Sequence, residues 1–251
     1  MKAALCRLLV TLVLGLAQHE AYAAPLTLVT SHYPPYCMEE GGQAKGVAVE
    51  LVKEAFSRMQ QDITIVFVPF ARAIEMVRTG QADAIFPFAL RPERKQFFNY
   101  TTEKLLSDPG ALFVRADSNI TFDGDFAKLA SFSIGMPRGT YQGDAFMQAI
   151  QTYQLKIEET KDQEQNVRKL VAKHLDIVVG PRLLVQDAAQ RINEAASIKL
   201  LYSDISEGAA FVAFSMHGNR AELITRLDQT FKKMRLDGTY RRIFGAVSAA
   251  K

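Results

Sequence analysis

The chain has 251 residues, of which 48% are apolar, and this is enough for a sizeable core in one large or two small domains. The formal net charge of +3 excludes the dense basic surface of a nucleic-acid-binding protein and the polybasic patch of a peripheral membrane protein. The histidines are too scattered to indicate a metal site, so we expect no metal and no cofactor.

The first 23 residues have the pattern of a secretory signal peptide. Lys2 and Arg7 precede an apolar run over residues 8–17, and residues 21–23 supply the small side chains of a cleavage site. The apolar run is about half of the roughly 20 residues that span a bilayer, which argues against a membrane anchor. We therefore expect a mature protein in the periplasm. Its one cysteine, Cys37, is expected to be a small, semi-buried thiol and forms no internal disulfide.

The first strand is expected at residues 26–30, and the loop that follows it carries two tyrosines. Pro34 and Pro35 prevent a strand or helix from continuing, so Tyr33 and Tyr36 lie at the carboxyl end of the strand. Both are candidates for contact with a ligand. Tyr36 is equally compatible with a place in the core.

A central stretch, residues 66–105, organises the chain. The β-branched run over residues 63–68 predicts a strand, and the helical spacing of Phe70, Ile74 and Val77 predicts a helix after it. A second apolar run over residues 84–88 predicts another strand, which ends at a charged turn.

Arginines gather at the ends of these elements: Arg72, Arg91 and Arg94. Ligands of open α/β sheets bind outside the carboxyl ends of the strands. A guanidinium group donates two parallel hydrogen bonds to one carboxylate, so this position suits an anion.

The second half of the chain repeats the alternation of strand and helix, which predicts a second lobe. A capping-box pattern at Asp162 and Gln165 marks the start of one of its helices. The loop Arg138-Gly139-Thr140-Tyr141 precedes another helix, and backbone N–H groups at such a loop suit an anion. A long amphipathic helix is expected to end near Asp237-Gly238.

Several motifs resemble, in order, those of the bacterial extracellular solute-binding proteins of family 3, the amino-acid-binding class. They span nearly the whole mature chain: Tyr33-Pro34-Pro35-Tyr36, Gly46-Val47, the G-Q-A-D-A run at 80–84, Pro92-Glu93-Arg94 followed by F-x-x-T, Gly139-Thr140, Leu236 to Tyr240, and Ile243-Phe244-Gly245. Each motif is weak alone, and the ordered set is specific.

The resemblance implies an α/β, two-lobed periplasmic-binding-protein fold of type II. In this fold each lobe is a mainly parallel sheet flanked by helices, and the ligand cleft lies between the lobes. It also implies that residues 24–110 and 209–251 form lobe 1 and residues 111–208 form lobe 2. The chain would cross between lobes near residues 109–113 and 205–210.

Family members hold the carboxylate of the ligand with an arginine at the position of Arg94, and an aromatic ring stacks on the ligand at the position of Tyr33. Phe70 matches a wall residue of the ligand site. With the residues singled out above, the ligand-binding candidates are Tyr33, Tyr36, Phe70, Arg72, Ala89, Arg94, Arg138, Thr140 and Tyr141.

Two departures from the family pattern affect the expected ligand. The family has small hydroxyl residues before the arginine of the P-E-R motif, whereas this chain has Phe88, Ala89, Leu90 and Arg91. The acidic residue that receives the ligand's ammonium group in lobe 2 is replaced by Pro181. We therefore expect an organic anion in preference to an ordinary amino acid.

The resemblance implies a small-molecule ligand, an ABC transporter permease as membrane partner and a monomeric protein. A dehydratase-like enzyme on the same fold is one alternative, although we find no catalytic residues to assign. The other alternative is a ligand-binding partner of a membrane sensor.

Overall fold

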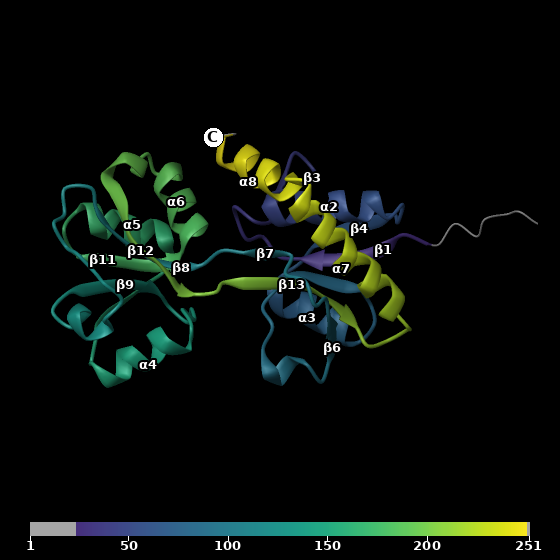
Figure 1. Cartoon of the computed structure of the whole chain (residues 1–251), viewed down its shortest axis with the longest axis horizontal. Coiled ribbons are helices and arrows are strands. Elements are labelled where there is room, and N and C mark those ends of the chain that lie inside the picture. Colours follow the sequence, from purple (N-terminus) through teal and green to yellow (C-terminus); the bar gives the residue numbers. More distant parts are fainter. Residues whose placement is uncertain (1–23, 250–251) are drawn as a thin grey trace, which may run out of the picture.

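A computed structural model describes residues 24–249, so the expected signal peptide lies outside the described residues. The described chain forms two separate sheets, each flanked by helices, and the two resulting lobes lie side by side (Figure 1). We call the lobe that contains the start of the described chain lobe 1 and the other lobe 2.

Lobe 1 is built on strands in the order β4-β1-β5-β13-β6, and β7 pairs with β13. β1 runs parallel to β4 and β5, whereas β13 runs antiparallel to β5, β6 and β7. The elements of this lobe are β1 (Leu26–Thr30), β2 (Met38–Glu40), β3 (Gln43–Lys45), α2 (Val47–Arg58), β4 (Ile63–Phe67), α3 (Phe70–Arg78), β5 (Ala84–Phe88), the 3-10 turn η1 (Pro92–Arg94), β6 (Phe98–Tyr100), β7 (Leu106–Ser107), β13 (Ala209–Ser215), α7 (Ala221–Leu236) and α8 (Thr239–Ala249).

Lobe 2 is built on strands in the order β10-β9-β11-β8-β12. β9 runs parallel to β10 and β11, whereas β8 runs antiparallel to β11 and β12. Its elements are β8 (Gly110–Arg115), η2 (Phe126–Leu129), β9 (Ser133–Pro137), α4 (Asp144–Thr152), β10 (Lys156–Thr160), α5 (Gln163–Val171), β11 (Ile177–Pro181), α6 (Arg182–Arg191), η3 (Ala195–Ser197) and β12 (Ile198–Ser206).

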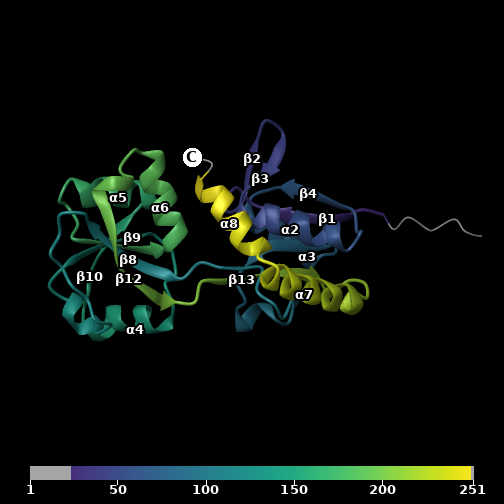
Figure 2. The same cartoon turned by 45° about the horizontal axis from the view of Figure 1, so that its top comes forward.

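The chain passes between the lobes from β7 to β8 and returns from β12 to β13 (Figures 1 and 2). The two crossings run antiparallel and stay paired: Ser107 faces Ala209, and Gly110 faces Ser206. Between these pairs the N–H of Asp108 donates to the carbonyl of Gly208 at 3.1 Å. The crossings therefore form a two-stranded ribbon that continues both sheets.

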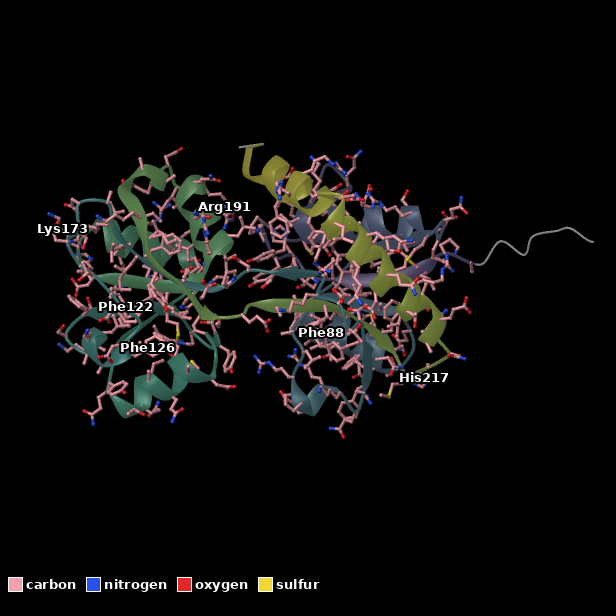
Figure 3. All side chains as sticks on the ribbon, viewed as in Figure 1. Phe88, Phe122, Phe126, Lys173, Arg191 and His217 are labelled. Atoms are coloured by element: carbon pink, nitrogen blue, oxygen red, sulfur yellow. The ribbon has the colours of Figure 1, made fainter. Side chains whose placement is uncertain are left out.

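Each lobe has its own apolar core. In lobe 1, Phe56 and Phe214 are fully buried between the sheet and helices α2 and α7. In lobe 2, Phe122 and Phe126 stack at 5.8 Å, and Phe126 meets the buried Phe146 edge to face. Figure 3 shows Phe122 and Phe126 within lobe 2 and Phe88 within lobe 1. Two cores of this kind allow the lobes to move as separate bodies.

The two-lobed α/β architecture predicted from the sequence is confirmed. Among the described strands, β1, β4 and β5 pair in parallel in lobe 1, and β9, β10 and β11 do so in lobe 2. The strands that follow the crossings, β8 and β13, join these sheets antiparallel. The helix predicted to end near Asp237 does so, and a further helix, α8, follows it. Between residues 24 and 249, no helix combines the length and the apolar character needed to cross a bilayer.

Candidate functional site

Arg94 ends the η1 turn that follows β5, and its guanidinium lies against aromatic rings. Its Cζ atom is 4.4 Å from the centroid of Phe88 and 6.0 Å from that of Phe70. One Nη1–H donates to the carbonyl of Ala89 at 3.1 Å, which fixes the direction of the side chain. Ala89 thus contributes its backbone to the placement of Arg94.

Burial, and to a smaller extent the neighbouring charge of Arg91, lower the pKa of Arg94 from its ordinary value. The guanidinium is nevertheless charged at neutral pH, because an arginine pKa stays far above that range. Within the described part of the chain, Arg94 forms no ion pair, and the carboxylate of Asp83, the residue before β5, pairs with Arg220. A partly buried cation without a protein carboxylate is a suitable site for a ligand carboxylate.

Aromatic side chains surround this arginine. Phe70, the first residue of α3, is 45% exposed and its ring lies 6.1 Å from that of the buried Phe88. The ring of Tyr100 stacks on that of Phe88 at 5.8 Å, with an angle of 11° between the rings. The exposed face of Phe70 therefore remains open for an apolar part of a ligand.

Two further arginines of lobe 1, Arg72 and Arg91, are exposed, and the charge of Arg91 acts on Arg94. Arg72 lies on α3 and has no ion-pair partner among the residues that the structure covers. The guanidinium of Arg91 lies 5.4 Å from the ring centroid of Tyr141, which belongs to lobe 2. This contact brings the residue before η1 in lobe 1 against the loop before α4 in lobe 2.

Several polar groups of the loop before α4 form hydrogen bonds within the protein, which the sequence did not indicate. Arg138 extends into solvent and donates to Glu159 at 2.9 Å, and its backbone N–H donates to the carbonyl of Thr160. Thr140 gives both its N–H and its hydroxyl proton to the carbonyl of Pro137. The expectation that these backbone N–H groups cradle an anion is therefore wrong for Arg138 and Thr140.

The two tyrosines of the first loop have different surroundings. Tyr33 is 42% exposed, and its ring lies 5.0 Å from that of Tyr36. Tyr36 is only 3% exposed, and its hydroxyl donates to Asp108. Tyr33 is thus available to a ligand, whereas Tyr36 supports it from the core.

Asp108 is a polar residue of this region that the sequence did not reveal. It lies in the first crossing, is 6% exposed, and accepts hydrogen bonds from Tyr36 and from the N–H of Leu183 at the start of α6. Burial is the main cause that raises the pKa of Asp108 above its ordinary value. No motif in the sequence joins Asp108 to α6, because the contact depends on the path of the chain.

Pro181 occupies the position that precedes α6 and has no side-chain hydrogen bond to the helix. A proline has neither a charge nor an acceptor on its side chain, so it cannot receive an ammonium group. The described residues bring Arg94, Phe70, Phe88 and Arg91 together on lobe 1 and place Tyr33 beside Tyr36, which is bonded to Asp108 of the first crossing.

Comparison with known proteins agrees with the two-lobed fold. The family model of bacterial extracellular solute-binding proteins, family 3, matches residues 26–246. The amino-acid-binding protein AabA of Dichelobacter nodosus is 22% identical over 223 residues, which are 86% of each chain.

Solved structures share the fold. The second substrate-binding domain of a putative amino acid ABC transporter from Streptococcus pneumoniae superposes with a TM-score of 0.72 at 22% identity, covering 88% of this chain and 98% of that one. A histidine kinase sensor domain similar to periplasmic binding proteins superposes with a TM-score of 0.66 at 18% identity, covering 91% and 97%. From the match to the family model, which extends over both lobes, we conclude that this chain belongs to the bacterial extracellular solute-binding proteins, family 3.

Proposed function

We propose that this protein captures a small carboxylate-bearing ligand in the periplasm and presents it to the permease of an ABC importer. The observation that carries the proposal is Arg94, whose guanidinium lies over Phe88 and forms no ion pair with a described residue. A buried or partly buried charge of this kind is stabilised by an opposite charge, which a ligand carboxylate supplies.

Closure of the two lobes completes the site in this proposal. Residues 24–110 and 209–251 act as one body and residues 111–208 as the other, and the ribbon between them works as a hinge. The ligand binds Arg94 and Phe70 on lobe 1, and Tyr33 stacks on it from the first loop. The permease then recognises the closed monomer, since only the closed form brings both lobes into one surface.

Among carboxylates we favour an organic anion over an ordinary amino acid. An amino acid also has the carboxylate that Arg94 requires, and the relative from Dichelobacter nodosus is an amino-acid-binding protein. However, by the resemblance Pro181 stands where the family has the acid for the ammonium group, and Arg91 adds positive charge beside Arg94. Both features favour a ligand with more negative charge and no ammonium group.

A sensory role is a second candidate. The likeness to a histidine kinase sensor domain supports a version in which the closed protein docks on a membrane receptor instead of a permease. In both roles the protein binds its ligand without converting it, so the ligand is recovered chemically unchanged after binding.

A thermal-shift screen of residues 24–251 tests the proposal, with amino acids, dicarboxylates, tricarboxylates and small cations as probes. A ligand at 100 times its dissociation constant adds about 2.7 kcal/mol to the free energy of unfolding. We expect a dicarboxylate or tricarboxylate to raise the melting temperature of the wild type and to leave the melting temperature of Arg94→Ala unchanged.

Arg78→Ala is the matched control, because Arg78 is an exposed arginine of α3 that pairs with Glu75 and lies outside the aromatic cluster. It should respond to the ligand like the wild type. Stabilisation by ordinary amino acids alone would contradict the argument from Pro181, and an equal response of Arg94→Ala would remove Arg94 from the site.

A further inference from the structure

Helix α6 begins without a cap of its own. The first N–H groups of a helix have no partner inside the helix, and a side chain at the N-cap position commonly accepts a bond from one of them. At α6 the N-cap residue is Pro181, whose side chain has no acceptor. An acceptor from another part of the chain can therefore bind at this helix end.

Asp108 supplies this acceptor from the first crossing between the lobes. Both of its carboxylate oxygens lie 3.0 Å from the N–H of Leu183, in the first turn of α6. A carboxylate at this place also compensates the positive end of the helix dipole. The start of α6, which belongs to lobe 2, is thus capped by a residue of the hinge.

The same carboxylate is bound to lobe 1. It accepts the hydroxyl proton of Tyr36, whose ring lies beside that of Tyr33. Leu183 and Leu184 also pack against the core of lobe 1. One buried side chain therefore contacts the aromatic loop of lobe 1 and the first turn of a helix in lobe 2.

The position of Asp108 is fixed by the second crossing as well. Its N–H donates to the carbonyl of Gly208 at 3.1 Å. A Cβ atom added to Gly208 would lie 1.7 Å from the carbonyl oxygen of Asp108, so the two backbones are in direct contact and a larger residue would push them apart. Asp108 thus cannot shift without moving both strands of the ribbon.

We propose that Asp108 is a positioning residue of the binding site, which holds the loop of Tyr33 and Tyr36 and the first turn of α6 at a set distance across the hinge. Because it occupies the N-terminal end of α6, it leaves the arginines of lobe 1 as the place for a ligand anion. The positioning of the loop and of α6 by Asp108 is supported by its contacts in the hinge. Only an effect on ligand affinity rests on the proposed function.

Hydrogen exchange of the ligand-free protein tests the cap. Asp108→Ala should raise the exchange rate of the Leu183 amide about tenfold or more, since this N–H loses its acceptor. Asp108→Asn keeps one oxygen that accepts the bond, so the rate should rise less than threefold. Unchanged exchange in Asp108→Ala would overturn the assignment.

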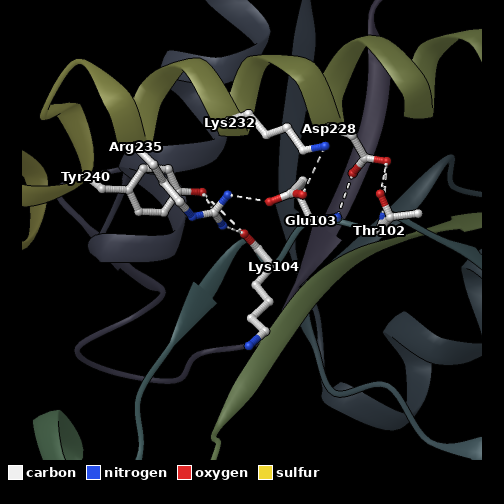
Figure 4. Close-up of polar contacts among 7 residues, drawn as sticks. All are labelled: Thr102, Glu103, Lys104, Asp228, Lys232, Arg235 and Tyr240. Carbon is white, nitrogen blue, oxygen red and sulfur yellow. Dashed lines mark hydrogen bonds and ion pairs between the residues drawn. The ribbon is translucent and has the colours of Figure 1, made fainter.

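Asp228 provides a matched control inside lobe 1. It is buried like Asp108 and accepts bonds from the N–H groups of Thr102 and Glu103, next to the pairing of Glu103 with Arg235 (Figure 4). Asp228→Ala also removes a buried carboxylate that accepts two backbone N–H bonds, but it does not touch the contact between the lobes. It should therefore leave the exchange of the Leu183 amide as it is in the wild type.

A distance measurement tests the link between the lobes and does not depend on exchange. Spin labels at Ser57→Cys on α2 and Gln148→Cys on α4 report the separation of the lobes, because both positions are exposed. We expect Tyr36→Phe, which keeps the cap and loses the bond to lobe 1, to broaden the distribution of distances in the ligand-free protein. Asp228→Ala should leave it unchanged.

This second measurement keeps the proposal falsifiable if Asp108→Ala does not fold, because Tyr36→Phe removes one hydroxyl group only. A distribution that is identical in Tyr36→Phe and the wild type, or that broadens equally in Asp228→Ala, would overturn the positioning role. If no carboxylate raises the melting temperature in the thermal-shift screen, the proposed ligand is wrong. The hydrogen-exchange and distance results on the ligand-free protein are not affected by that outcome.

Discussion

Cys37 lies in the core of lobe 1 and is fully buried. Burial raises the pKa of its thiol to about 12, and the neighbouring Thr30 hydroxyl opposes the rise to a smaller extent. The thiolate, which is the reactive form, is therefore scarce at neutral pH. The sequence indicated a semi-buried, unreactive thiol, and the structure places it deeper than that.

We predict that Cys37 reacts with an aromatic disulfide reagent far more slowly in the folded protein than in urea. A pKa of about 12 leaves on the order of 1,000-fold less thiolate than a free cysteine has at neutral pH. Absorbance of the released thiol measures the rate. Equal rates in buffer and in urea would show that the side chain is accessible.

The free energy of unfolding depends on pH through the carboxyl group of Asp108. Burial raises its pKa above the ordinary value of 3.8, while the bonds from Tyr36 and Leu183 and the charge of Arg182 oppose the rise. The folded state thus holds the proton more tightly than the unfolded state does. Its contribution to the free energy of unfolding is largest below the unfolded pKa and falls as the pH rises through the folded pKa.

We predict that Asp108→Asn, which is neutral at every pH, lacks this fall. The free energy of unfolding of the wild type minus that of the variant should decrease as the pH rises above 3.8, the ordinary pKa, and become constant above the folded pKa. Asp187, the other buried carboxyl group near Tyr36, is present in both proteins. Urea denaturation at several pH values measures the trend, and a constant difference would contradict it.

At the scale of single elements, α5 and α6 show which caps a sequence reveals. Asp162 accepts the N–H of Gln165 at 2.8 Å, three residues away, and this local pattern was predicted from the sequence. The side chain of Gln165 accepts in turn from the N–H of Lys161. The cap of α6 comes from Asp108, 75 residues before Leu183, and only the course of the chain through the hinge brings the two together.

We predict that Asp162→Ala lowers the free energy of unfolding by about 1 kcal/mol, the usual loss for an N-cap aspartate. Asp162→Asn, which retains a side-chain acceptor, should lose only a few tenths of that amount. Urea denaturation measures both variants. Equal losses in the two variants would indicate that the hydrogen bond to Gln165 is not the cause.

The same distinction between local and distant contacts applies to the candidate site. The strands and helices around Arg94 follow from hydrophobic periodicity, and the P-E-R motif identified the arginine itself. The contact between Arg91 and Tyr141 joins residues of different lobes, and no local pattern could predict it. Likewise, the loop at Arg138 and Thr140 resembled an anion site, but the N–H of Arg138 donates to Thr160, 22 residues later, and the N–H of Thr140 donates within its own turn to Pro137.

At the scale of the whole molecule, two lobes with separate cores are joined by a paired ribbon. The ordered motifs predicted this architecture, because they lie along both lobes in the order of the family. The mixed pairing in each sheet was not predicted, since it depends on the direction in which the crossing strands enter. A ribbon of this kind permits closure with small changes at a few backbone positions.

The measurement that tests the central claim most directly is the distance between the lobes before and after ligand is added. The probe is the dicarboxylate or tricarboxylate with the largest thermal shift, and the labels are those at positions 57 and 148. We predict that this anion moves the distribution of the wild type to shorter distances and leaves that of Arg94→Ala in place. Closure of Arg94→Ala at the same anion concentration, or binding to the wild type without any closure, would contradict the account.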